Sequence, residues 1–119
     1  MSRLFTTLFL LILASNLFAQ KWIDSLEVAR KAYKSGNYQK AIKYYKSAQN
    51  NAPKDVDLTD EIAQSTYRAR DFEGAEKAFQ QSSSNKKSKE EKARSQHNIG
   101  NAQMKKRITM EQLHLIKKH

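Results

Sequence analysis

The chain has 119 residues, which is enough for one domain at most. Its 22 Lys and Arg residues outnumber 12 Asp and Glu residues, so the formal net charge is +10. Cysteine is absent, which excludes disulfides, thiolate zinc sites and a lipid-modified N-terminus that needs a cysteine after the export signal.

Residues 1–19 have the layout of a secretory signal peptide. Arg3 supplies a short positive region, residues 8–14 are an apolar run, and Ala19 ends the segment with a small side chain. We predict export with cleavage after Ala19, which leaves 100 residues (119 − 19) and, without Arg3, a charge of +9. Leu17 is larger than the residue usual at its place, and the alternative is an uncleaved membrane anchor. That anchor would be short, because a spanning helix needs about 20 apolar residues.

The spacing of apolar residues predicts helices near residues 21–35, 38–50, 56–69, 72–82 and 89–106. Gly36 suits the left-handed backbone that ends the first of these helices. Pro53 stops the second helix, and Asp55 and Asp57 are expected to cap the third. At the next turn Arg70 takes the place of the glycine, so the backbone of this turn should be more strained.

A polar linker, residues 82–87, leads to the fifth helix. Ser88 and Glu91 have the spacing of a capping box at its start. After Lys106 the apolar spacing changes, and residues 107–119 are expected to form a tail outside the pattern.

The helical pattern occurs twice, 34 residues apart. The first copy contains Val28, Ala29, Tyr33, Tyr38, Ala41, Tyr45 and Ala48, and the second has Ile62, Ala63, Tyr67, Phe72, Ala75, Phe79 and Ser82. A partial third copy, with Ile99, Gly100 and Met104, follows at a spacing of 37 because three residues are inserted in the linker. A period of about 34 residues with two helices per unit is that of the tetratricopeptide repeat (TPR), and the chain resembles this family over residues 22–106.

The resemblance implies an all-α fold, a TPR-type stack of antiparallel helix pairs with two full repeats plus the first helix of a third. Such stacks form a right-handed superhelix whose concave groove holds peptide segments of other proteins. The implied domains are a signal peptide at 1–19, a TPR domain at 20–106 and a non-repeat tail at 107–119. Within the TPR domain the repeats cover about 22–55, 56–89 and, incompletely, 93–106.

A narrower resemblance is to small exported TPR proteins of Bacteroidetes-type aerotolerance operons, encoded beside von Willebrand A-type membrane proteins. The short signal, the immediate helices and the Asn-x-Gly-Asn sequence at 98–101 carry this resemblance. It implies a protein of the periplasm or cell envelope of a Gram-negative bacterium. A von Willebrand A-type membrane protein is then a candidate partner.

The TPR resemblance implies that the outward-facing residues of each first helix line the groove. These are Leu26, Arg30, Tyr33 and Lys34; Asp60, Gln64, Tyr67 and Arg68; and His97, Asn101, Met104 and Lys105. Arg30, Lys34, Arg68 and Lys105 favour an acidic segment or a C-terminal carboxylate as the ligand. Asp60 opposes this bias, and a lysine-rich helix surface is commonly only solvated.

No catalytic, cofactor-binding or metal site is expected. His97, His114 and His119 lack metal-ligand spacing, and neither a phosphate-binding loop nor a nucleophile motif is present. The aromatic residues recur with the repeat and are expected in the core, so they do not indicate a base-stacking surface. We therefore expect a protein-binding scaffold without enzyme activity, cofactors or nucleic-acid partners. A basic nucleic-acid-binding helical protein is a weaker alternative.

A further alternative is a fragment of a longer TPR protein, cut short by a change of reading frame near Lys106–Arg107. The fifth helix has an apolar side with Ile99 and Gly100, and in a repeat protein a following helix would cover it. The sequence pattern after Lys106 predicts no such helix. The competing interpretation is a genuine short tail in which Leu113 and Ile116 cap the fifth helix.

Overall fold

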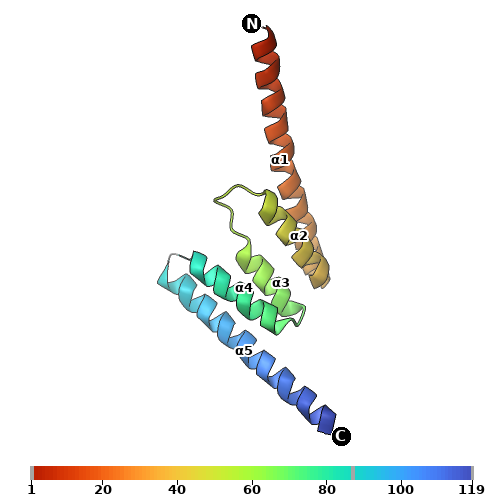
Figure 1. Cartoon of the computed structure of the whole chain (residues 1–119), viewed down its shortest axis with the longest axis vertical. Helices are drawn as coiled ribbons and strands as arrows, with labels where there is room; N and C mark the ends of the chain where they lie inside the picture. The colour runs from red at the N-terminus through yellow and green to blue at the C-terminus, as the bar shows by residue number, and fades with distance from the viewer. Residues whose placement is uncertain (1, 87, 119) are drawn as a thin grey trace. The chain divides into compact units, whose positions relative to one another are not determined.

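The computed structural model describes residues 2–86 and 88–118, and all regular structure in these residues is α-helical. The helices are α1 (Ser2–Lys34), α2 (Tyr38–Asn51), α3 (Thr59–Arg68), α4 (Phe72–Asn85) and α5 (Lys89–Lys118) (Figure 1). The all-α prediction is therefore confirmed. Residues 1, 87 and 119, which belong to the predicted signal peptide, linker and tail, lie outside the described residues. The chain divides into two compact units, Met1–Leu58 and Thr59–His119, each described by itself below.

In the first unit, the C-terminal part of α1 packs antiparallel against α2. The contact is made by small side chains, since Ala29, Ala41 and Ala48 are fully buried. Tyr45 fills the remaining space and is 5% exposed. Because an alanine lets two helix backbones approach closely, burial of Ala41 here agrees with the packing that the repeat pattern predicts.

The helix α1 begins at Ser2, far earlier than the predicted start near residue 21. Residues 2–34 contain neither glycine nor proline, so nothing in the backbone interrupts the helix. The large apolar side chains described between Leu4 and Leu17 are exposed. Among the described residues, no helix combines the length and the apolar character needed to cross a membrane.

The loop after α2 is held by one side chain. The amide group of Gln49 donates to the carbonyl oxygen of Val56 and accepts from the backbone N–H of Leu58. A turn from Pro53 to Val56 lies within the same loop. These bonds replace helical ones, so α3 begins at Thr59, and the prediction that it begins near residue 56 with Asp55 as a cap was wrong.

In the second unit, α4 packs against both α3 and α5. The core cluster joins all three helices through Ala63, Ala75, Phe79, Ile99 and Ala102. Burial of Ala75 again agrees with the repeat pattern. At the surface of the α4–α5 contact, Glu76 accepts hydrogen bonds from Gln103 (3.0 Å) and Lys106 (3.3 Å).

The turns within the two units are copies of each other at a spacing of 34 residues. Gly36 and Arg70 both have positive φ, 80° and 66°. Asn37 and Asp71 then cap the following helices by accepting from the backbone N–H three residues on. The rings that flank the turns also agree, because Tyr33–Tyr38 and Tyr67–Phe72 are both edge-to-face pairs with centroids 5.4 Å apart. The sequence period is therefore also a period of the structure.

The capping box at the start of α5 is confirmed. Ser88 accepts from the N–H of Glu91 at 3.1 Å, and the Glu91 carboxylate accepts from the N–H of Ser88 at 3.4 Å. The helix then continues to Lys118, so the prediction that it ends near residue 106 was wrong. No glycine or proline follows Gly100, which explains the continuation. Leu113 and Ile116, proposed to cap the helix, are 50% and 71% exposed.

Candidate functional site

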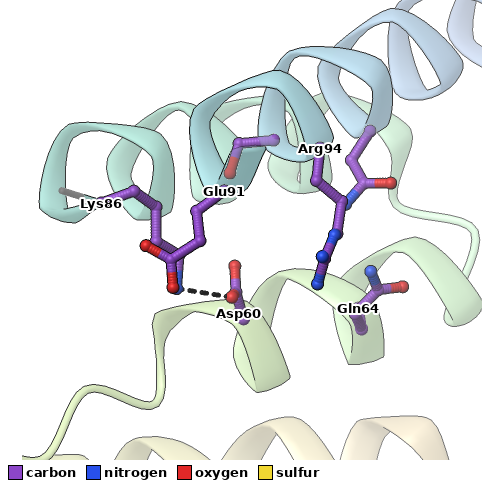
Figure 2. Close-up of a pocket in the computed structure, with 7 residues that line it drawn as sticks. Asp60, Gln64, Lys86, Glu91 and Arg94 are labelled. Carbon is purple, nitrogen blue, oxygen red and sulfur yellow. Dashed lines mark ion pairs between the residues drawn. The ribbon is translucent and has the colours of Figure 1, made fainter. Parts of the chain in front are cut away.

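A hollow of about 220 Å³ lies between α3 and α5 in the second unit (Figure 2). It is lined by polar side chains, namely Asp60, Gln64, Lys86, Glu91, Arg94, Ser95 and Asn98. Two features of the sequence place them. α3 presents Asp60 and Gln64 one turn apart, and α5 presents Arg94, Ser95 and Asn98 on one face.

Asp60 is fixed from two sides. The buried hydroxyl of Ser82 on α4 donates to its carboxylate, and the Nζ of Lys86 lies 2.6 Å from its other oxygen (Figure 2). The Lys86 side chain is largely buried, at 19% exposed. Asp60 therefore already has a cationic partner and does not present an uncompensated negative charge to a ligand.

Glu91 is also engaged, because its carboxylate accepts from the N–H of Ser88 in the capping box. Arg94 differs from both acids. Its side chain is exposed and extends from α5 toward α3, where the guanidinium lies near Asp60 and Gln64 in Figure 2. Within residues 2–86 and 88–118 its side chain makes no ion pair or hydrogen bond. Arg94 is thus the cation of the hollow that has donors to offer.

Ser95 adds a second available group. The residue is only 3% exposed, yet it lines the hollow. Because Ser95 lines the hollow, its hydroxyl can donate to or accept from a ligand that enters there.

A second hollow of about 160 Å³ lies farther along the same two helices. Its lining residues are Gln64, Tyr67, Phe79, Asn98 and Asn101. Gln64 and Asn98 belong to both hollows, so the two form one surface. We call this surface, made of Asp60, Gln64, Tyr67, Arg94, Ser95, Asn98 and Asn101, the α3–α5 face.

Four of the residues named from the sequence lie on the α3–α5 face: Asp60, Gln64, Tyr67 and Asn101. Arg68, His97, Met104 and Lys105 are exposed and line neither hollow. Tyr67 also packs on Phe72 and Phe79, so its ring forms the floor of the surface.

Four of the residues expected in the groove belong to the first unit. Arg30 and Lys34 are exposed there, and Leu26 is half-buried. Tyr33 is half-buried and packs its ring on Tyr38.

The sequence reading missed five lining residues: Lys86, Glu91, Arg94, Ser95 and Asn98. A signal for two of them was present, because moving 34 residues on from Asp60 and Gln64 gives Arg94 and Asn98. The groove residues predicted on α5 were instead placed by a spacing of 37 residues, the distance from Ile62 to Ile99. These positions lie three residues, about one helical turn, beyond those given by a spacing of 34.

The α3–α5 face presents groups that can bind a polar ligand. It offers a guanidinium, a hydroxyl and three side-chain amides around an aromatic floor. In the part of the chain that the structure describes, no group of three or more His, Cys, Asp or Glu is arranged to hold a metal ion. Comparison of the chain with family models, with curated proteins and with solved structures found no match.

Proposed function

We propose that the chain is an exported TPR-type interaction module that holds a peptide segment of a partner protein on the α3–α5 face. The observation that carries the proposal is the polar surface formed by two consecutive first helices of the 34-residue pattern, on which the guanidinium of Arg94 has no ion-pair or hydrogen-bond partner among the described residues. The repeated turns support the TPR assignment. We also propose that the helix pairs stack as a right-handed TPR superhelix.

The chemistry of the face favours a carboxylate ligand. Arg94 supplies a planar pair of donors that matches a carboxylate, and the hydroxyl of Ser95 lies one residue further along the helix. The side-chain amides of Gln64, Asn98 and Asn101 can bond to the backbone of an extended peptide. The ligand class is an acidic segment or a C-terminal carboxylate, as the sequence also suggested.

The cellular setting remains part of the proposal. The layout of residues 1–19 supports export and cleavage after Ala19, and this places the module in the periplasm or cell envelope. A von Willebrand A-type membrane protein is the proposed kind of partner, on the basis of the narrower resemblance alone.

The test compares two substitutions on the same helix that remove the same charge. Arg94→Ala removes the free cation of the α3–α5 face, and Lys105→Ala removes an exposed cation outside it. A set of acidic peptides with a free C-terminal carboxylate is titrated by calorimetry, beside the same peptides as carboxamides. Loss of a charge-assisted hydrogen bond of about 1.5–3 kcal/mol should weaken binding by roughly 10- to 150-fold in Arg94→Ala.

Lys105→Ala should change the affinity little beyond the general salt effect. Equal weakening by both substitutions would mean that binding follows the overall positive charge, and the α3–α5 face would lose its role. If no carboxylate peptide binds to the wild type, the ligand class is wrong.

A second proposal is that the chain is a fragment of a longer TPR protein. The supporting observation is Gly100, which is exposed and has open space where a Cβ would stand, although Ala29 and Ala63 at the equivalent positions are fully buried. Ile99, in contrast, is covered within the unit and is only 7% exposed. Sequencing of the gene tests this proposal. A shifted reading frame after the codon of Lys106 that continues the 34-residue pattern would support it, and a stop within a few codons would refute it.

A further inference from the structure

The face of α5 that points away from α4 carries a regular stripe. Its members are Ala93, His97, Gly100, Met104, Ile108, Glu111 and Leu115. All seven are exposed, and the three large apolar ones, Met104, Ile108 and Leu115, are 46%, 39% and 58% exposed. The stripe repeats every 11 residues, since Ala93, Met104 and Leu115 are evenly spaced, and such a repeat stays on one side of a nearly straight helix.

The opposite side of α5 is occupied. Ser95, Ile99 and Ala102 are buried there, and Ile99 and Ala102 belong to the core cluster with α4. The stripe shares no residue with the α3–α5 face. At Gly100 no atom lies within 4 Å of the place of a Cβ, so the stripe has a notch at this point.

The spacing of the stripe reads the same in both directions, namely 4, 3, 4, 4, 3 and 4 residues. A pair of antiparallel helices related by a twofold axis at the central residue therefore brings the stripe onto itself, position by position. We propose that two copies of this chain dimerise through α5, antiparallel, with the twofold axis at Met104. This proposal does not depend on the ligand of the α3–α5 face. It is an alternative to the reading-frame proposal, because the seam uses Ile108, Glu111 and Leu115.

The residues that this axis brings together are complementary in size. Gly100 lies opposite Ile108, so the notch of one copy receives the branched side chain of the other. Small Ala93 lies opposite Leu115, and the two Met104 side chains meet at the axis. Between these apolar contacts His97 lies opposite Glu111, which gives a donor and an acceptor within the seam.

The charges of α5 also favour this orientation. Its last turn is basic, with Lys117 and Lys118, whereas in its first turn Glu90 and Glu91 balance Lys89 and Lys92. An axis at residue 104 is close to the middle of the helix, so antiparallel overlap extends along about 45 Å and puts each basic last turn beside the two carboxylates of the other first turn. A parallel pair would instead place the two basic last turns together and Gly100 against Gly100, which leaves the notch empty.

The central basic residues do not oppose one another in this arrangement. Lys105, Lys106 and Arg107 lie opposite Gln103, Ala102 and Asn101 of the other copy, which are uncharged. Repulsion from the net charge of +10 is therefore not concentrated at the seam. A second copy fits the stripe better than an unspecified apolar partner, because the side-chain sizes along the stripe are self-complementary.

Single-cysteine cross-linking of the full chain tests the register, since the natural sequence has no cysteine. Met104→Cys should give covalent dimers with a short bismaleimide, because the two residues meet at the axis. Ala93→Cys alone should not, since two copies of residue 93 lie 22 residues apart along the axis, about 33 Å. A mixture of Ala93→Cys and Leu115→Cys chains should give a dimer that contains one chain of each kind.

Gln80→Cys, on the exposed side of α4, is the control position that should remain monomeric. Equal cross-linking at all positions would indicate unspecific association, for instance through the exposed apolar residues of Leu4–Leu17, and it would overturn the proposal. Cross-linking of Ala93→Cys to itself would indicate a parallel pair and would equally overturn it.

Gly100→Lys separates dimerisation from folding. Lysine fits the open space of the isolated unit and is a better helix former than glycine, so the variant should melt no lower than the wild type by circular dichroism. In the dimer, however, its side chain fills the notch that receives Ile108. Sedimentation equilibrium should give twice the 13.8 kDa chain mass for the wild type and the single-chain mass for Gly100→Lys. A wild type that is monomeric, or a variant that still dimerises, refutes the proposed seam.

Discussion

Arg70→Gly should stabilise the protein relative to Arg70→Ala. Arg70, two residues after the end of α3, has a φ of 66°, a left-handed conformation that is strained for any residue with a Cβ. The equivalent turn of the first unit has Gly36 with a φ of 80° and the same pattern of backbone hydrogen bonds. Both turns therefore impose the same backbone, and only one of them has the residue that adopts it without strain.

The expected gain follows from two opposing terms. A left-handed residue with a side chain costs about 1–2 kcal/mol, and glycine costs about 0.4–1 kcal/mol through its greater freedom in the unfolded chain. The glycine variant should thus exceed the alanine variant by about 0.5–1 kcal/mol in free energy of unfolding. Alanine is the proper reference, since the Arg70 guanidinium lies 5.8 Å from the Phe72 ring centroid and both variants lose this contact.

Urea unfolding followed by circular dichroism at 222 nm measures the difference. For a slope of about 2 kcal/mol per molar urea, the midpoint of Arg70→Gly should lie roughly 0.3–0.5 M above that of Arg70→Ala. Gly36→Ala should lower the urea midpoint by a similar amount relative to the wild type. A Cβ at Gly36 meets no atom within 4 Å, so a clash does not add to this effect. Equal midpoints for the two Arg70 variants would refute the assigned strain.

Ala41→Leu should lower the free energy of unfolding by about 1–3 kcal/mol, because Ala41 is fully buried between α1 and α2, whereas Gln80→Leu on an exposed face should change it little. Thermal melts compare the two. Hydrogen bonds from Gln103 and Lys106 lower the pKa of Glu76 below its ordinary value of 4.5. The stability that this carboxylate contributes is present above pH 4.5 and is lost as the pH falls through the lowered pKa. In this acidic range the melting temperature of the wild type should therefore fall more steeply with pH than that of Glu76→Gln. Ser88→Ala removes the cap of α5 and should cost about 0.5–2 kcal/mol, seen as a lower midpoint in urea, while an unchanged midpoint would mean that the cap is dispensable.

The interior helices could be predicted from the sequence because their boundaries are local. Gly36 ends α1 at the predicted turn, Pro53 follows the end of α2, and Ser88 starts α5. The long helices could not be bounded in the same way. At the start of α1 and at the end of α5 no breaking residue marks a limit, and the apolar pattern of a repeat does not report where a helix continues without packing.

The α3–α5 face was predictable on one helix and not on the other. Gln64 and Tyr67 lie where the repeat pattern puts them, because α3 packs on α4 through Ala63 as the pattern requires. On α5 the inserted linker residues gave two possible spacings, 34 and 37. The lining residues Arg94 and Asn98 follow the spacing of 34, whereas Gly100, which the spacing of 37 places on buried Ala63, is exposed. Lys86 could not be placed at all, since its ion pair with Asp60 depends on how the linker folds back.

The side chain of Gln49 makes the loop after α2 part of the first folded unit. By bonding to both Val56 and Leu58, it gives the loop the protection that backbone amides normally obtain from a helix or a neighbouring strand. The Leu58 amide should therefore exchange its hydrogen with solvent as slowly as amides at the end of α2, although it lies outside any helix. In native-state exchange, Gln49→Ala would release this amide and turn a fixed segment of the unit into an ordinary connection.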